Sequence, residues 1–329
     1  MRTPILSLMG FAVLAVTAIG ADAVAQAPAK PAASEIITLG TGGGPQPRAG
    51  SAQSANMLIV NGKLYLIDAG DGVTRRIVQA GLKVPDVGVI FITHNHSDHM
   101  GGLANLMNTE WESARKTPIN VYGPPGTERV VAAARELYRP NAEIRWSEGR
   151  RVPLEQVFVG HDVGTGTIIF QDENVRVTAA ENTHFKFTRD EPGFGRHKSY
   201  SYRFETPDRS IVFTGDTGPS DALVALATGA DVLVTEVNSL EEVKESRIKA
   251  GLWQQMPPVE QEGFIRHMQE EHLTPEAVGT LATRAGVRTV VLTHFGMSGI
   301  AKDDHRRFVG QVAKTYPGRV LVAQDGAKF

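Results

Sequence analysis

The 329-residue sequence contains no cysteine. Disulfide bonds are therefore excluded, and any metal ion bound by this chain would need histidine, carboxylate or water ligands, because no thiolate is present. The sequence also lacks a basic run, and its formal net charge at pH 7 is -2. This charge gives no electrostatic reason to expect a polyanion as the partner, so nucleic acid is not the expected ligand.

The N-terminal apolar stretch, at residues 5–19, is too short to indicate a membrane span. It follows Arg2 and precedes the small residues Ala23-Val24-Ala25. A charged start, a short apolar core and a small-residue cleavage site predict a signal peptide over residues 1–25. Cleavage after Ala23 is an alternative, and so is an uncleaved anchor helix. We predict an exported protein, periplasmic or secreted, with a flexible tether over residues 26–34 and one folded domain over residues 35–329.

Hydrophobic patterning predicts mixed α and β structure in this domain. Strands are expected at residues 35–39, 56–60, 63–67, 88–92, 119–122, 167–170, 175–179, 199–204, 210–214, 232–235, 289–293 and 319–322. Helices are expected near residues 73–80, 127–138, 239–271 (with a break at 253–258), 275–284 and 303–316. Residues 139–166 have mixed charge and are predicted to form an irregular surface excursion.

A histidine-rich motif directly follows the apolar strand at residues 88–92. It contains His94, His96, Asp98 and His99. His94 and His96 project to the same side of an extended chain, whereas Asp98 and His99 follow as the chain turns into a helix. Imidazoles with a carboxylate are suitable zinc ligands. A polar turn with hydrogen-bonded histidines is the alternative, but crowding so many titratable groups without a cation is costly. We therefore predict a metal site.

Further candidate ligands lie at the ends of other predicted strands. His184 follows residues 175–179, Asp216 follows 210–214, and His294 follows 289–293. Each of the three, taken alone, is more typical of a capping or turn residue. Together with the first motif, they supply enough ligands for two metal ions.

These motifs and their order resemble those of the metallo-β-lactamase superfamily over nearly the whole chain after the tether. The resemblance implies an α/β fold, the αββα sandwich, in which two mixed sheets have helices outside and metals at one edge. It implies two Zn²⁺ ions, with manganese or iron as alternatives. Carried over residue by residue, it assigns His94, His96 and His184 to one ion, Asp98, His99 and His294 to the other, and Asp216 to a bridging position. Asp68 would bond to the metal loop.

A second pair of residues resembles the ribonuclease Z branch of this superfamily. Glu236 ends the strand at 232–235, and His272 opens the helix that precedes the strand of His294. The resemblance implies that His272, oriented by Glu236, protonates the leaving group; a carboxylate partner keeps an imidazole charged enough to act as an acid. Asp98, His272 and Glu236 are the predicted catalytic residues. Packing of His272 at the helix start is the alternative. Residues between Glu236 and His272 could fold over the site.

The function predicted from these features is hydrolysis of a small anionic ester through attack by a hydroxide shared between the metals. The branch includes secreted arylsulfatases and phosphodiesterases, and we narrowly favour a sulfate ester over a phosphodiester. Predicted export and the lack of a basic, glycine-rich arm disfavour the tRNA 3′-processing endonuclease, which stays an alternative. A lactonase or β-lactamase-like hydrolase and a non-catalytic metal-binding module are further alternatives. A homodimer is expected only by analogy with the branch.

Overall fold

The computed structural model describes residues 34–296 and 304–329. The predicted signal peptide and residues 26–33 of the predicted tether lie outside the described residues. Ser34, the last residue of that tether, is buried. Its backbone N–H donates to Asp208 Oδ2 at 2.9 Å, and its carbonyl accepts from Arg209 Nη2 at 2.6 Å. Ser34 therefore belongs to the folded domain rather than to a tether.

The strands of the described chain form two seven-stranded sheets. The first has the order β14 (Ala327–Lys328), β1 (Glu35–Gly40), β2 (Ala55–Val60), β3 (Lys63–Ile67), β4 (Val87–Phe91), β5 (Ile119–Gly123) and β6 (Phe158–Asp162). The second has the order β13 (Arg319–Val322), β12 (Thr289–Phe295), β11 (Val232–Val237), β10 (Ser210–Phe213), β9 (Tyr200–Glu205), β8 (Arg176–Glu181) and β7 (Ile168–Gln171). Both sheets are mixed: β1–β2 and β8–β9 pair antiparallel, whereas β3–β4 and β11–β12 pair parallel.

The two sheets pack face to face around a shared apolar core. Phe91 on β4 is fully buried, and its ring contacts Phe204 of the other sheet with centroids 5.1 Å apart. Phe170 packs on the same ring from β7, with centroids 5.6 Å apart. Burial of each large apolar side chain contributes about 1.5–3 kcal/mol to folding, so this layer fixes the position of β4 and the motif after it.

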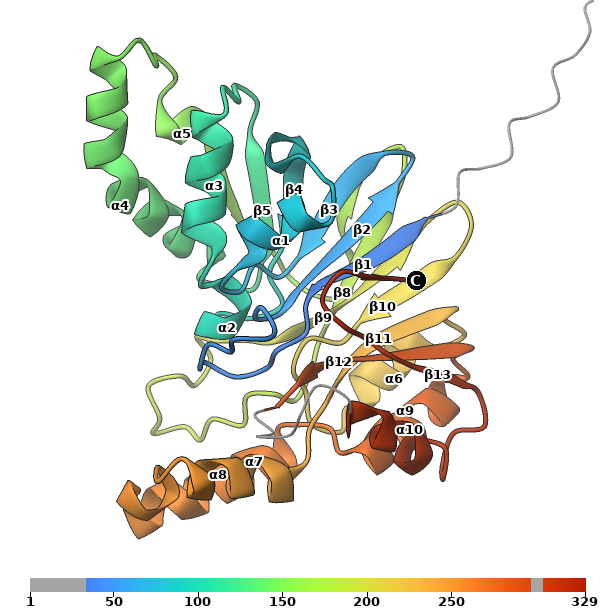
Figure 1. The fold of residues 1–329 in the computed structure, drawn as a ribbon. Coiled ribbons are helices and arrows are strands. Elements are labelled where there is room, and N and C mark those ends of the chain that lie inside the picture. Colours follow the sequence, from blue (N-terminus) through green and yellow to red (C-terminus); the bar gives the residue numbers. More distant parts are fainter. Residues whose placement is uncertain (1–33, 297–303) are drawn as a thin grey trace, which may run out of the picture. The chain divides into compact units, whose positions relative to one another are not determined.

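Helices cover the outer faces of both sheets (Figure 1). The first sheet packs against α1 (Val73–Gln79), α3 (Leu103–Glu112) and α4 (Thr127–Ser147). The second packs against α6 (Asp221–Ala227), α9 (Pro275–Ala285) and α10 (Arg307–Val312). These four layers confirm the predicted αββα sandwich. None of the helices within the described ranges combines the length and apolarity needed to span a bilayer.

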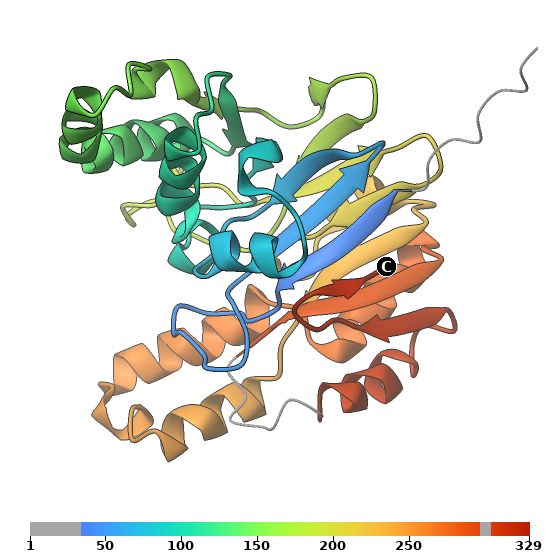
Figure 2. The same ribbon diagram turned by 45° about the horizontal axis from the view of Figure 1, so that its top comes forward.

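A helical hairpin projects from one end of the sandwich (Figures 1 and 2). It consists of α7 (Leu240–Lys249), the short 3₁₀ turn η2 (Trp253–Gln255) and α8 (Pro258–Glu270). The Ser239 hydroxyl begins α7 by accepting from the Glu242 N–H, as expected of an N-cap serine. The predicted break within residues 239–271 is thus the turn between two helices.

The prediction of an irregular segment at residues 139–166 is wrong. Helix α4 continues through Pro140 to Ser147 and is followed by α5 (Leu154–Val157) and β6. A proline inside a helix removes one hydrogen bond, but Arg139 pairs with Glu136 and Glu155 at 2.8 and 2.6 Å across this region. The helix expected at residues 303–316 is shorter, since η3 (Asp304–Arg306) precedes α10; residue 303 lies outside the described residues. Strand β14 was not predicted.

Candidate active site

Three histidines form the first group of candidate ligands. His94 and His96 follow β4, and His184 lies in the loop after β8. His96 Nδ1 lies 3.1 Å from His94 Nε2 and 3.1 Å from His184 Nε2. Extended backbone at His96, with φ -71° and ψ 151°, carries the motif from the strand into the short helix α2 (Ser97–Met100). The three ring nitrogens therefore converge on one point.

The second group combines α2 with the end of β12. His99 Nε2 lies 3.1 Å from His294 Nε2, which lies 3.3 Å from Asp98 Oδ2. His294 has a φ of 47°, a conformation that residues other than glycine rarely adopt. Such strain is retained where a functional site requires a particular side-chain direction.

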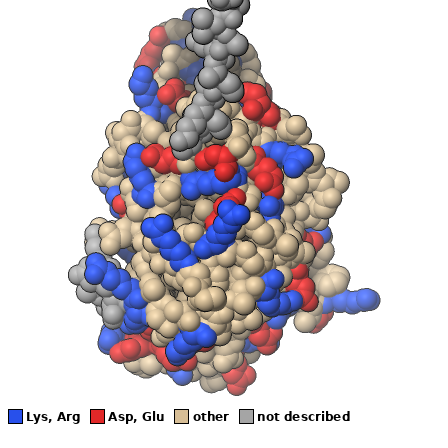
Figure 3. Space-filling view, turned by 90° about the vertical axis from the view of Figure 1, so that its right-hand side faces the viewer, with Lys and Arg blue, Asp and Glu red and all other residues tan. Residues whose placement is uncertain are grey.

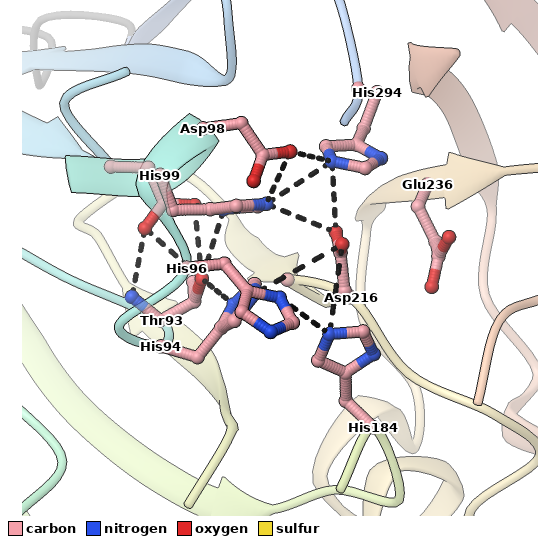
Figure 4. Close-up of polar contacts among 12 residues, drawn as sticks. Thr93, His94, His96, Asp98, His99, His184, Asp216, Glu236 and His294 are labelled. Atoms are coloured by element: carbon pink, nitrogen blue, oxygen red, sulfur yellow. Dashed lines mark hydrogen bonds and ion pairs between the residues drawn. The ribbon is translucent and has the colours of Figure 1, made fainter. Parts of the chain in front are cut away.

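Asp216 lies between the two groups (Figure 4). Its Oδ1 is 3.3 Å from His99 Nε2 and 3.2 Å from His294 Nε2. Its Oδ2 is 4.0 Å from both His94 Nε2 and His184 Nε2. One carboxylate oxygen thus faces each group, which is the arrangement a bridging ligand needs. The structure brings all seven predicted ligands together.

The donor set fits two divalent metal ions. Asp216 Oδ1, which faces His99 and His294, is buried without a hydrogen-bond partner among the described residues. An unsatisfied buried polar atom costs about 1–3 kcal/mol, and more if it is charged, so a cation would relieve this cost. A tetrahedral metal ion with metal–nitrogen distances of about 2.0–2.1 Å holds its ligand nitrogens about 3.3 Å apart. Neighbouring ring nitrogens in each group lie 3.1 Å apart, which is close to this spacing.

The electrostatics of the cluster supports the same interpretation. Burial lowers the pKa of His94 and His184 well below its ordinary value, so both imidazoles are neutral and able to bind metal. Burial also acts on His99, but the carboxylates of Asp216 and Asp68 outweigh it and raise the His99 pKa. Without a metal, the second group therefore retains a proton that metal binding would displace.

Neighbouring polar groups orient the candidate ligands. Asp68 Oδ2 accepts from His99 Nδ1 at 2.8 Å, while its Oδ1 accepts from the Thr93 backbone N–H at 2.8 Å. His184 Nδ1 donates to the Glu271 carbonyl at 3.0 Å. These bonds leave each Nε2 facing the cluster, as is usual for metal-binding histidines. Asp68 therefore bonds to the metal loop.

His272 and Glu236 meet beside the seven candidate metal ligands, which we call the metal cluster. His272 Nδ1 donates to Glu236 Oε2 at 2.7 Å, and Glu236 Oε1 accepts from the Thr217 backbone N–H at 2.6 Å. Burial opposes the charged imidazole, but Glu236 outweighs burial and raises the pKa of His272 to about 9. The pair can therefore hold a proton near neutral pH.

A family model described as "Beta-lactamase superfamily domain" matches residues 64–295. The chain belongs to the metallo-β-lactamase superfamily. Among curated relatives, ribonuclease Z of Mycobacterium sp. (strain KMS) is 29% identical over 293 residues, covering 88% of this chain and 94% of that protein. Ribonuclease Z of Mycobacterium bovis (strain BCG / Pasteur 1173P2) is 28% identical over 294 residues, with 88% and 96% covered. These similarities support the ribonuclease Z branch.

Solved structures of the superfamily share the fold of this chain. The metallo-β-lactamase fold protein YhfI from Bacillus subtilis has a TM-score of 0.65 at 16% identity, over 91% of this chain and 99% of that one. Human tRNase Z, short form, has a TM-score of 0.60 at 23% identity, over 90% and 98%. Zn²⁺-bound PqqB from Methylobacterium extorquens has a TM-score of 0.59 at 16% identity, over 90% and 99%.

A cleft of about 270 Å³ is lined by four of the seven candidate ligands of this superfamily member, His96, Asp98, Asp216 and His294. On one side lie the metal ligands and the glycine-rich loop at residues 43–45; Gly44 N–H in this loop donates to Asp98 Oδ2 at 2.6 Å. On another side lie residues of α7 and α8, so the segment between Glu236 and His272 forms a wall of the site.

Some residues of this cleft were not predicted from the sequence. His267, at the end of α8, has its Nε2 3.1 Å from His272 Nε2 and donates from Nδ1 to Glu271 Oε2 at 2.9 Å. The spacing of four residues between His267 and Glu271 on a helix was a usable signal. Arg247 and Phe264 also line the cleft, but no motif marked them.

Proposed function

We propose that this chain hydrolyses phosphodiester bonds with the aid of two divalent metal ions. The observation that carries the proposal is that four of the seven candidate ligands line one cleft with His272, whose Nδ1 is bonded to Glu236. The relatives named ribonuclease Z support a phosphodiester as the bond that is cleaved. This support is why we place the phosphodiester ahead of the sulfate ester that the sequence had narrowly favoured.

Each part of the site has a separate role in this reaction. The seven candidate ligands would hold two divalent ions, which would supply an activated water and neutralise charge on the phosphate. Asp216 orients toward both groups of histidines and keeps them at a fixed separation. His272 donates its Nε2 proton to the departing oxygen, and Glu236 holds the imidazole in the tautomer and charge state that this donation requires.

The tRNA 3′-processing endonuclease is the second candidate, because the two ribonuclease Z relatives match over 94% and 96% of their length. Against it stand the predicted export and the net charge of -2. Figure 3 shows the side of the molecule that is turned away from the α7–α8 hairpin, and acidic and basic side chains are interspersed on that face. We therefore propose a small diester as the substrate and treat tRNA precursors as the alternative to be tested.

The deciding experiment compares substrates with the metal-loaded protein starting at Gln26. Bis(4-nitrophenyl) phosphate, 4-nitrophenyl sulfate, a lactone and a tRNA precursor are assayed side by side, with a chelator control. The largest kcat/KM for the phosphate diester supports the proposal. Faster sulfate or lactone turnover would replace it, and 3′ cleavage of the tRNA precursor at a higher kcat/KM would establish the endonuclease. Metal binding without turnover of any substrate would leave only a metal-binding module.

We also propose that the protein is exported after removal of residues 1–25, on the basis of the signal-like N-terminus. Expression of the full chain, followed by cell fractionation and N-terminal sequencing, tests this proposal. Mature protein in the periplasm or medium, beginning at Gln26 or, with the alternative cleavage, at Val24, is the expected result. Full-length protein retained in the cytoplasm would contradict it.

A further inference from the structure

The helical hairpin supplies a wall of the cleft that differs in chemistry from the metal cluster. Its lining residues are Val243 and Arg247 on α7 and Phe264, His267 and Met268 on α8. Three of these five side chains are apolar, whereas the opposite side presents the imidazoles and carboxylates of the candidate ligands and the glycine-rich loop. A substrate bound at the metals would thus place one end against an apolar surface.

Arg247 is the only lysine or arginine that lines the cleft within the described residues. Its guanidinium Cζ lies 4.4 Å from the centroid of the Phe264 ring, and its Nη1 lies 3.9 Å from Met256 Sδ. Stacking on an aromatic face orients a guanidinium and leaves its N–H groups available for an anion.

The charge of Arg247 has no carboxylate partner among the described residues. Its Nε is buried without a hydrogen bond. Glu271, a carboxylate near this side of the cleft, is bonded to His267 instead. Partial burial lowers the pKa of Arg247. A desolvated cation of this kind gains most from an anionic ligand group.

The position of the wall indicates which part of a substrate it would contact. His272 lines the same cleft, and His267 and Met268 of α8 lie between it and Phe264 in sequence. His272 Nε2 lies 3.1 Å from His267 Nε2 of α8, so the group beyond an oxygen protonated by His272 would lie toward the hairpin.

We propose that Arg247 and Phe264 form a leaving-group subsite that favours an aromatic ring carrying a negative charge. Phe264, with Val243 and Met268 beside it, contacts the ring, and Arg247 pairs with the anion. This inference rests on the proposed function, since it takes the departing group to lie on the His272 side. It adds a substrate class: diesters whose leaving group is an anionic aryl alcohol.

Two matched substrates test the subsite. Methyl 4-nitrophenyl phosphate and methyl 3-carboxy-4-nitrophenyl phosphate release chromogenic phenols that differ by one carboxylate. The wild-type protein should prefer the carboxylated diester in kcat/KM, and Arg247→Met should reduce that preference by roughly tenfold or more, as expected for loss of one charge-assisted hydrogen bond. Arg247→Lys should retain part of it. Comparing the preference between variants cancels the intrinsic difference in leaving-group acidity.

Lys244→Met is the matched control. Lys244 lies on the same helix but stacks on Trp253, with its Nζ 4.8 Å from the ring centroid, and does not line the cleft. The Lys244→Met variant should prefer the carboxylated diester as strongly as the wild-type protein does. A preference unchanged in Arg247→Met would overturn the subsite, and so would an equal loss in Lys244→Met.

A binding measurement separates failure of the subsite from failure of the proposed function. Calorimetric titration with the free phenols, 5-hydroxy-2-nitrobenzoate and 4-nitrophenol, requires no turnover. Tighter binding of the carboxylated phenol that is lost in Arg247→Met supports the subsite even if no diester is hydrolysed. Diester turnover combined with equal binding of both phenols would retain the function and remove the subsite. If Arg247→Met does not fold, the same titrations with Arg247→Lys and Phe264→Leu decide between these outcomes.

Discussion

His272 Nδ1 lies 2.7 Å from Glu236 Oε2, although the two residues are 36 positions apart in the sequence. The hydrogen bond joins the end of β11 to the start of the segment that leads into α9. The helical hairpin lies between these two residues in the chain, and both His272 and Arg247 of the hairpin line the cleft.

The His272–Glu236 pair predicts that the loss of hydrolysis rate in a His272 variant depends on the leaving group. His272→Ala should slow diesters with alkyl leaving groups by about 10²–10⁴-fold, because these need a proton as they depart. Nitrophenyl diesters depart without one and should be slowed much less. Bound metal, measured by elemental analysis, should stay at the wild-type level.

Glu236→Gln is the companion variant, since it preserves shape but removes the charge that raises the His272 pKa. Its effect should be in the same direction and smaller. Equal slowing of alkyl and nitrophenyl diesters by His272→Ala would show that His272 has a structural role rather than a proton-donor role.

The two groups of candidate ligands predict that different substitutions release different amounts of bound metal. His96 is solvent-exposed at the mouth of the site, whereas Asp216 is buried between the two groups. His96→Ala should abolish turnover and release mainly the ion of the first group, while Asp216→Ala should weaken both. Elemental analysis after dialysis against a weak chelator measures the metal retained.

His161→Ala serves as the histidine control for these variants, because His161 stacks on Tyr122 and bonds to Asn120 Oδ1 at 2.9 Å. It should keep full metal content and turnover. Full metal retention in both His96→Ala and Asp216→Ala would contradict the ligand assignment.

Gly43 approaches the ring of His294 so closely that a side chain would not fit. A Cβ placed there would lie 2.5 Å from His294 Nδ1. Gly43→Ala should therefore displace this imidazole, lower metal retention at the second group and reduce kcat by at least tenfold, on the scale of ligand-orientation losses. Metal content and kcat are measured together. Gly164→Ala, where the added Cβ meets nothing within 4 Å, should change neither quantity.

Much of this site follows from the sequence because its ligands stand at strand ends. Alternation and apolar runs located β4, β10, β11 and β12. The parallel strands β10, β11 and β12 share one sheet and bring their following residues to one edge, and β4 of the other sheet delivers its histidines to the same place. The full length of α4 was not predicted, because Pro140 and the mixed charge after it are typical of irregular structure. The ion pairs that Arg139 makes in this region are visible only in the folded protein. The roles of His267, Arg247 and Phe264 depend on how α7 and α8 fold back, which no local pattern specifies.

Glu110 on α3 predicts a pH dependence of stability that is independent of the metal site. Its side chain is fully buried, and Oε1 has no hydrogen-bond partner, while Oε2 accepts from Arg115 Nη1 at 2.9 Å. The same Nη1 also donates to the Pro85 and Val87 carbonyls at 2.6 and 3.1 Å. Burial raises the pKa of Glu110 to about 9, and Arg115 only partly opposes this effect.

The sign of the effect follows from proton linkage. Between the ordinary value of 4.5 and about 9, the unfolded chain has lost the Glu110 proton and the folded protein keeps it. The free energy of unfolding should therefore be highest below pH 4.5, as far as this group is concerned, and fall as pH rises, by at most about 1.4 kcal/mol per pH unit. Glu110→Gln removes this contribution. Urea unfolding at pH 6, 7 and 8.5 should show wild-type stability declining relative to the variant. Parallel pH profiles would show instead that Arg115 keeps Glu110 ionised in the folded protein.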